Sequence, residues 1–324
     1  MPQTQLAKGR FNVNNHAHVI KGKVASAEWF YLYFKHREII SHLSRQGAGR
    51  YKLNKATLEQ LHCAIPSTEE QSAIANALAD VDALLTELEN LIAKKQAIKT
   101  GTIQQLLTGK TRLPQFTTYT EGENLGQTKG TKPSDLGEIP EDWNVTALGK
   151  LFEITAGGDL RKTEFSPIQS NNHPYPIYSN AITGKGLYGY CTSFDYSGEF
   201  LTITARGGIG FSVDRSEAFC AIGRLLVLSP KNKTSCKFVS EFSNQFIEFA
   251  NESTGVPQLT APQVAKYKVI IPGYEEQTAI ATILSDMDEE IQTLEQRLAK
   301  TRQIKQGMMQ ELLTGRTRLP FDKN

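Results

Sequence analysis

Residues 66–74 read Pro-Ser-Thr-Glu-Glu-Gln-Ser-Ala-Ile, and residues 272–280 read Pro-Gly-Tyr-Glu-Glu-Gln-Thr-Ala-Ile. The match continues without a gap to residues 105–114, Gln-Leu-Leu-Thr-Gly-Lys-Thr-Arg-Leu-Pro, and residues 311–320, Glu-Leu-Leu-Thr-Gly-Arg-Thr-Arg-Leu-Pro. Over these 49 positions 26 residues are identical at a constant offset of 206. A match of this length and spacing indicates two modules of one plan, since solenoid repeats follow one another directly.

Both repeats have the pattern of a long helix. Two glutamates fill each expected first turn, where the helix dipole favours negative charge, and Gly109 and Gly315 are suitable helix stops. Each helix is predicted to have about 38 residues and a length of about 57 Å. Apolar residues recur at spacings of four and three, which is typical of a coiled coil. They are Ile74, Leu78, Val81, Leu85, Leu88, Ile92, Ile98 and Leu106 in the first repeat, and Ile280, Leu284, Met287, Ile291, Leu294, Leu298, Ile304 and Leu312 in the second.

The simplest partner for each apolar seam is the other seam, in an antiparallel pair. We expect Ile74, Leu78, Leu85 and Leu88 to pair with the second set, Ile280, Leu284, Ile291 and Leu294. A homodimeric coiled coil is the alternative use of the same seams. Gly101 and Gly307 interrupt both helices at one register, each at a cost of about 1 kcal/mol against alanine. This repeated cost indicates a close crossing or a bend.

The rest of the chain divides around these helices. Residues 115–140 are rich in Thr, Gly, Lys and Glu and predict a linker. Residues 141–272 contain β-branched and aromatic runs separated by Gly-, Asn- and Ser-rich turns, which predict a strand-dominated module. The predicted fold class is therefore α/β: β-rich modules (1–66 and 141–272) alternating with two long helices (67–114 and 273–324) that pair as an antiparallel coiled coil.

Composition excludes several classes of protein. The net charge of +2 is no general polycation, so any contact with nucleic acid is expected to be local. The N-terminus lacks the apolar core of a signal peptide, and no stretch is long and apolar enough to span a membrane. The four cysteines have no C-x-x-C spacing and are expected to be free buried thiols in a reducing cytoplasm.

The paired repeat resembles the conserved regions of type I restriction–modification specificity subunits. Glu-Glu-Gln-x-Ala-Ile, a long helix and Leu-Leu-Thr-Gly-x-Thr-Arg-Leu occur twice, and residues 137–143, Gly-Glu-Ile-Pro-Glu-Asp-Trp, resemble the opening of that family's target recognition domains. Residues 202–210 and 254–259 resemble strands and turns within them. The resemblance implies that each recognition domain reads one half of a bipartite site in double-stranded DNA. It also implies that the helices hold the two domains apart and dock methyltransferase subunits, which the restriction subunit joins.

The chain departs from the family's plan at its N-terminal side. Residues 49–53 align with residues 255–259, so residues 1–65 match only the last part of a recognition domain. The first recognition domain is therefore expected to be truncated, through a gene fragment, a recombined phase-variable allele or a misassigned start.

Candidate DNA contacts are polar and cationic loop residues, because base edges need donors and acceptors and phosphates need cations. In the second recognition domain they are Arg161, Lys162, Thr163, Asn180, Lys185, Tyr188 and Arg206. In the first they are Lys8, Arg10, Asn14, Asn15 and His16. Arg224 is interpreted as structural. Each loop is also what an ordinary solvated turn contains.

No chemistry of the chain's own is expected. Residues 184–189 match G-x-G-x-x-G, but a β-like segment follows where a dinucleotide site needs a helix. His16 and His18 lack a third metal ligand. The sequence therefore predicts a non-catalytic specificity subunit without cofactor or metal. The alternative is a coiled-coil scaffold whose β-rich modules bind protein or glycan.

Overall fold

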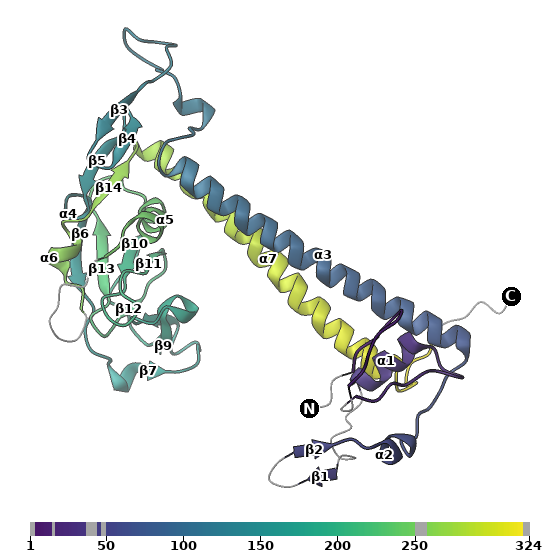
Figure 1. Cartoon of the computed structure of the whole chain (residues 1–324). Coiled ribbons are helices and arrows are strands. Elements are labelled where there is room, and N and C mark those ends of the chain that lie inside the picture. The colour runs from purple at the N-terminus through teal and green to yellow at the C-terminus, as the bar shows by residue number, and fades with distance from the viewer. Residues whose placement is uncertain (1–3, 15–16, 37–43, 47–49, 250–257, 320–324) are drawn as a thin grey trace. The chain divides into compact units, whose positions relative to one another are not determined.

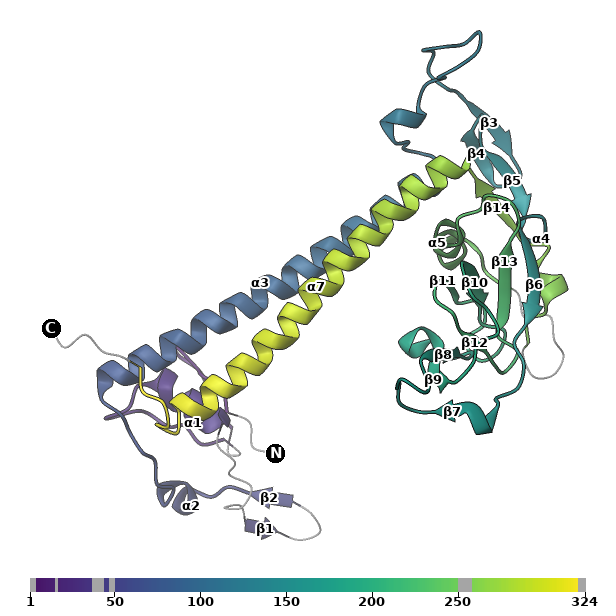
Figure 2. The ribbon, with the colours of Figure 1, turned by 180° about the vertical axis from the view of Figure 1, so that it is seen from behind.

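The computed structural model describes residues 4–14, 17–36, 44–46, 50–249 and 258–319. They fall into two compact units, residues 1–95 with 290–324 and residues 96–289. Two helices of 39 residues each, α3 (Thr68–Leu106) and α7 (Tyr274–Leu312), pass through both units and lie side by side (Figures 1 and 2). Their lengths and ends agree with the repeat in the sequence, and Gly109 and Gly315 follow them with positive φ angles of 70° and 73°.

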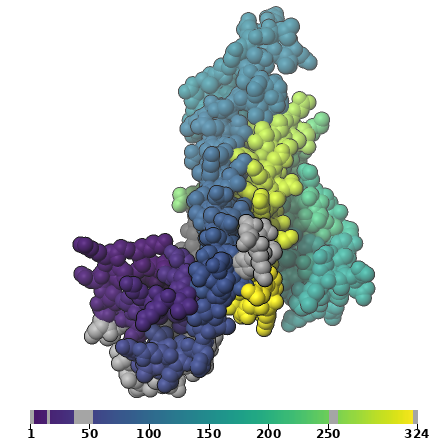
Figure 3. Space-filling model, turned by 90° about the vertical axis from the view of Figure 1, so that its right-hand side faces the viewer, coloured from purple at the N-terminus to yellow at the C-terminus, as the bar shows by residue number. Residues whose placement is uncertain are grey.

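The two helices are antiparallel within each unit. In the first unit, Glu70 of α3 pairs with Arg318 and Glu89 pairs with Arg302 of α7. Lys95 pairs with Glu290 in the same unit, and in the second unit Lys99 of α3 pairs with Asp288 of α7. The blue surface of α3 borders the yellow surface of α7 in the space-filling view (Figure 3). The antiparallel pair predicted from the seams is therefore present.

The seam residues differ in burial. Ile74, Leu78, Leu88, Ile280, Leu284 and Ile291 are buried, whereas Leu85 and Leu294 are half-buried. Ile98 and Ile304, which were also predicted to lie on the seams, are 45% and 49% exposed. Each lies six residues after the preceding seam residue, Ile92 or Leu298, so it breaks the spacing of four and three and lies off the apolar stripe.

The first unit adds short elements to its helix ends. They are α1 (Ala27–His36), a hairpin of β1 (Ser44–Gln46) and β2 (Arg50–Lys52), and α2 (Lys55–Glu59). Trp29 and Leu32 of α1 are buried against Ile74 and Leu78 of α3 and against Leu312 of α7. An amphipathic helix on the paired helices thus provides the core of this unit.

The second unit contains the β-rich module. One antiparallel sheet has the order β11-β10-β13-β6, and a second sheet, β12-β8-β9-β7, has one parallel pair, β12 with β8. Two-stranded sheets β14-β5 and β3-β4 complete it. The strands are β3 (Thr131–Ser134), β4 (Gly137–Pro140), β5 (Asn144–Ala147), β6 (Phe152–Ala156), β7 (Phe165–Ser166), β8 (Tyr175–Tyr178), β9 (Leu187–Cys191), β10 (Phe200–Ile203), β11 (Ser212–Arg215), β12 (Cys220–Ala221), β13 (Leu226–Pro230) and β14 (Lys268–Ile271).

Helices close the core of this module. They are α4 (Leu148–Leu151), α5 (Cys236–Phe246) and α6 (Ala261–Val264), with short 3-10 turns η2 (Pro114–Phe116), η3 (Lys162–Glu164) and η4 (Thr183–Gly186). Phe238 and Val239 of α5 share one core with the central strands and with Leu106 and Leu284 of the long helices. The module therefore joins the paired helices through a continuous apolar core.

The predicted linker, residues 115–140, holds more structure than its composition indicates. Strands β3 and β4 form a hairpin whose turn has Gly137 at φ 98°. Ile139 is 1% exposed and belongs to the main core. One buried isoleucine in a polar segment is too weak a periodic signal to predict a strand.

Candidate nucleic-acid interface

Asn180 joins three loops of the β-rich module. Its Nδ2 donates to the Gly223 carbonyl at 2.7 Å, and its Oδ1 accepts from the Ala205 backbone N–H at 2.7 Å. The loops are residues 179–186 after β8, 204–210 after β10 and 222–225 before β13; we call them the Asn180 loops. Asn180 is thus engaged at both ends of its amide, which is a different use from the base contact predicted for it.

The Asn180 loops carry three exposed cations, Lys185, Arg206 and Arg224. Arg206 donates from Nε and Nη2 to Gln258 Oε1 at 3.2 and 2.8 Å. Lys185 and Arg224 both have positive φ angles, 52° and 69°. Lys185 and Arg206 are predicted DNA contacts, whereas Arg224 was interpreted as structural. The position of Arg224 directly after Gly223 in a turn is the sequence signal that could have identified it.

A buried arginine supports the first of these loops. Arg215 is 5% exposed, lies 3.5 Å from the centre of the Tyr178 ring and donates to the Lys185 carbonyl at 2.5 Å. Burial lowers the pKa of Arg215, while the neighbouring Tyr178 and Glu217 act in the opposite direction. Burial, together with a hydrogen bond to Glu217, raises the pKa of Tyr178 to about 12. The backbone at Lys185 is therefore fixed by Arg215, which in turn packs on Tyr178, and neither residue was predicted from the sequence.

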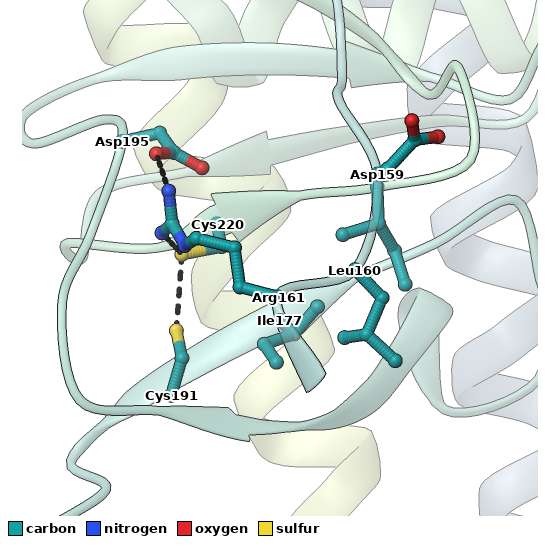
Figure 4. A pocket seen from close by; sticks show the side chains of 8 residues that line it. Asp159, Leu160, Arg161, Ile177, Cys191, Asp195 and Cys220 are labelled. Carbon is teal, nitrogen blue, oxygen red and sulfur yellow. Dashed lines mark hydrogen bonds and ion pairs between the residues drawn. The ribbon is translucent and has the colours of Figure 1, made fainter. Parts of the chain in front are cut away.

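Arg161 lines a small pocket together with Asp195 and Cys220 (Figure 4), and its side chain is 42% exposed. Its guanidinium pairs with Asp195 at 2.8 Å and with Glu164 at 3.2 Å, and it also contacts the Cys220 Sγ at 3.1 Å. The Sγ atoms of Cys191 and Cys220 are 3.0 Å apart, and both thiols are free. These contacts favour a structural role for Arg161, although it is exposed like its neighbours Lys162 and Thr163.

Tyr188 offers an exposed aromatic surface beside this pocket. It is 52% exposed and packs at 5.6 Å between ring centres on Phe165 of β7. The structure therefore brings together the Asn180 loops and leaves Tyr188, Lys162 and Thr163 accessible on neighbouring elements.

Three of the candidates in the first unit, Lys8, Arg10 and Asn14, lie in the described part of the chain. Lys8 forms an exposed ion pair with Glu28 at 3.2 Å, and Arg10 and Asn14 are exposed. Asn15 and His16 lie outside the described residues. Among the residues that are described, no group of three or more potential metal ligands occurs. No helix in the described part of the chain is long and apolar enough to cross a membrane.

The Glu-Glu-Gln motif does the same work in both units. Gln71 donates to the Pro66 carbonyl at 2.9 Å and accepts from the Ser26 N–H, and Gln277 donates to the Pro272 carbonyl at 2.9 Å and accepts from the Ser235 N–H. Ser26 and Ser235 cap α1 and α5, which are therefore equivalent elements. The motif thus anchors a capped helix on each copy of the repeat.

The second glutamate of each motif holds the arginine that follows the opposite helix. Arg318 pairs with Glu70, and Arg112 pairs with Glu276, both at 2.5 Å. Arg112 also pairs with Asp142, and these two carboxylates raise its pKa although burial lowers it. We call these pairs the clasps. The residues of the two clasps lie at equivalent positions of the two repeats, so the duplication is seen in these ion pairs as well as in the sequence.

Comparison with known proteins places this architecture in a family. Residues 3–100 and 140–303 match the model of the type I restriction modification DNA specificity domain. The chain therefore belongs to this family. Its relatives are specificity subunits of type I restriction systems, which are non-catalytic DNA-recognition components. This agrees with the prediction that the chain has no catalytic activity of its own.

Individual relatives agree with this assignment. The chain is 26% identical over 315 residues to the putative type I restriction enzyme MjaX specificity subunit of Methanocaldococcus jannaschii, covering 92% of this chain and 70% of that protein. It is 24% identical over 324 residues to the MjaVIII specificity subunit of the same organism, covering 92% and 72%. The crystal structure of the type I S subunit from M. genitalium is similar in fold, with a TM-score of 0.61 and 18% identity over 89% of this chain and 73% of that one.

Proposed function

We propose that the β-rich module reads part of a DNA site through the Asn180 loops and the exposed residues beside them. The observation that carries this proposal is that Asn180 links three loops by two hydrogen bonds. These loops carry the exposed cations Lys185 and Arg206. Cations on such loops contact phosphates and base edges, and a fixed backbone reduces the entropy lost on binding. Lys162, Thr163 and Tyr188 extend the same proposed surface.

The first test measures binding of duplex DNA by the chain together with its methyltransferase subunit. The double variant Lys185→Ala with Arg206→Ala should bind at least 10-fold more weakly at moderate salt and show a shallower salt dependence. The control removes two exposed lysines outside the loops, Lys150 and Lys266. Equal loss in both double variants would show that only general charge matters, and indifference to DNA and salt would favour a protein- or glycan-binding scaffold.

We propose that methyltransferase subunits dock on two equivalent surfaces of the long helices. Ile98 and Gly101 form one surface, and Ile304 and Gly307 form the other. Both isoleucines are about half exposed, and a Cβ added at either glycine would meet nothing within 4 Å. Packing within the chain therefore requires neither glycine, although each glycine destabilises its helix relative to alanine. The close approach of a second protein would explain why glycine occurs at both positions.

Replacing Ile98 and Ile304 by Asp should abolish co-purification with the methyltransferase subunit and leave the chain folded. The matched control places Asp at Gln104 and Gln310, which are exposed and equivalent in the two repeats. A second copy of this chain is the alternative occupant. If the Asp variants change only the oligomeric state of the isolated chain, the surfaces serve a homodimer and the docking proposal is wrong.

We propose further that the restriction subunit joins this methyltransferase complex and that the assembly acts in the cytoplasm. Family membership supports both statements. Methylome sequencing of cells that express the chain with its methyltransferase subunit tests the assembled function. An asymmetric bipartite adenine motif indicates that both modules read DNA, and a palindromic motif indicates that the second module reads DNA in a dimer.

A further inference from the structure

Three described residues other than glycine have positive φ angles: Lys185 at 52°, Arg224 at 69° and Asn232 at 58°. Asparagine tolerates this left-handed conformation, but residues such as lysine and arginine are disfavoured in it. Both disfavoured residues are exposed cations in the Asn180 loops. Backbone strain of this kind is retained where the surrounding structure enforces it and often marks a functional position.

The turn that carries Arg224 is tight. The Leu225 N–H donates to the Ile222 carbonyl at 3.2 Å, and both central residues, Gly223 and Arg224, have positive φ. This is the type I′ pattern, whose second central position favours glycine. Local backbone preference therefore disfavours arginine at position 224. The presence of arginine there is explained by a role of its side chain.

The backbone of this turn is fixed from several sides. Ile222 donates to the Tyr178 carbonyl at 2.9 Å, Gly223 donates to the Gly158 carbonyl at 2.9 Å, and Leu225 is 1% exposed. The exposed Arg224 guanidinium forms no hydrogen bond or ion pair with the described residues. The side chain is thus presented to solvent from a rigid base, as preorganised binding requires.

Asn180 connects Arg224 to the second arginine of the loops. It binds the Gly223 carbonyl, one residue before Arg224, and the Ala205 N–H, one residue before Arg206. One amide therefore sets the spacing of the two turns from which these arginines project. Nε and Nη2 of Arg206 contact Gln258, and Nη1 has no hydrogen-bond partner among the described residues.

We infer that Arg224 is a specificity-determining residue that reads a guanine in the major groove, that Arg206 acts beside it, and that Asn180 positions both turns and does not itself contact a base. This inference rests on the proposed DNA-reading function. Guanine is the base whose O6 and N7 accept two hydrogen bonds from one guanidinium. A fixed backbone suits this directional contact, whereas a phosphate contact needs only charge.

The decisive variant is Arg224→Gly, because glycine suits the turn and removes only the side chain. The chain with its methyltransferase subunit is expressed in cells, and the methylated motif is determined by methylome sequencing. Duplexes that carry each base at each motif position are then compared in competition binding. At one position the preference for guanine should fall about 10-fold or more, while thermal stability is equal or higher.

Arg224→Lys separates base reading from phosphate binding. Lysine keeps the charge but loses the bidentate geometry, so the guanine preference should fall while the salt dependence of binding is retained. If Arg224→Gly leaves the motif unchanged and weakens binding equally on all duplexes, Arg224 contacts a phosphate and the inference is wrong. If the wild-type complex methylates no defined motif, the proposed function itself fails, and the inference falls with it.

Asn180→Asp tests the positioning role. The carboxylate still accepts from Ala205 but no longer donates to Gly223, so the guanine preference at the Arg224 position should weaken, and restoration of asparagine should recover it. Loss of preference at an adenine position instead would mean that Asn180 reads a base, which contradicts the inference.

Discussion

Two buried tryptophans differ in the hydrogen bonding of the indole nitrogen. Trp143 Nε1 donates to Glu276 at 3.0 Å. Trp29 Nε1 is buried and has no hydrogen-bond partner among the described residues. A buried donor without a partner costs free energy, whereas a bond to a charged acceptor stabilises the fold. Trp29 is 1% exposed and Trp143 is 0% exposed, so burial does not distinguish the two side chains.

Replacing each tryptophan by phenylalanine should therefore have unequal effects. Trp143→Phe should lower the free energy of unfolding by about 2 kcal/mol more than Trp29→Phe, since only the first change removes a satisfied charged hydrogen bond. Denaturant unfolding followed by circular dichroism measures both. Equal losses would mean that ring volume alone determines the effect.

The raised pKa of Tyr178 makes the stability of the fold depend on pH. Burial, with the hydrogen bond to Glu217, raises its pKa to about 12, above the usual value of 10. The folded state thus favours the neutral phenol, and this contribution to stability is complete below pH 10 and lost as pH rises from 10 to 12. We expect the difference in unfolding free energy between the wild type and Tyr178→Phe to shrink over that range. A constant difference between pH 8 and 11.5 would contradict this expectation.

The contacts that the candidate residues make within the fold could not be predicted from the sequence. Asn180 and Arg161 were selected because amides and guanidinium groups suit base edges, yet Asn180 binds two backbone groups and Arg161 binds Asp195 and Glu164. These partners lie 25 or more residues away in three of the four contacts, and sequence spacing does not encode them. Arg224 was passed over because its positive φ angle depends on the turn that the neighbouring loops enforce.

Elements were easier to predict from sequence than contacts. The helices α3 and α7 agree with the repeat because each has its own glutamates, seam and terminal glycine. Strands β8, β10, β13 and β14 coincide with apolar runs, since each contributes buried residues to the core of the module. The hairpin β3-β4 escaped prediction because its residues are mostly polar and exposed.

The two clasps have the same residues in different surroundings. Arg112 and Glu276 have side chains that are 9% and 3% exposed, and Asp142 and Trp143 complete the network. In the other clasp the Arg318 side chain is 70% exposed, although that of Glu70 is only 5% exposed. An exposed partner is screened by water, so the second clasp is expected to contribute less.

Glu276→Gln should therefore lower the free energy of unfolding by about 2 kcal/mol, because it leaves a buried guanidinium with weaker partners. Glu70→Gln, at the equivalent position, serves as the matched control and should cost less. High salt should reduce the effect at Glu70 more than that at Glu276. The opposite ranking in urea unfolding would show that exposure does not decide the strength of the clasps.

At the scale of the whole molecule, one duplicated plan is built on cores of different size. In the described residues, the core beneath α1 has six buried apolar residues, whereas the core that contains α5 has 24. Both helices are capped by a serine and tied to a buried glutamine of the repeat. Their local chemistry is therefore matched, and the amount of buried apolar surface is the main difference.

This difference predicts unequal local stability, because backbone hydrogen bonds open more readily where fewer apolar groups are buried. In native-state hydrogen exchange, amides of α1 should exchange at least 10-fold faster than amides of α5, after correction for intrinsic rates. Peptides from the two ends of α3 provide the internal reference, since they belong to one continuous helix and differ in which core they join. If α1 is protected as strongly as α5, anchoring by the repeat rather than core size determines the local stability.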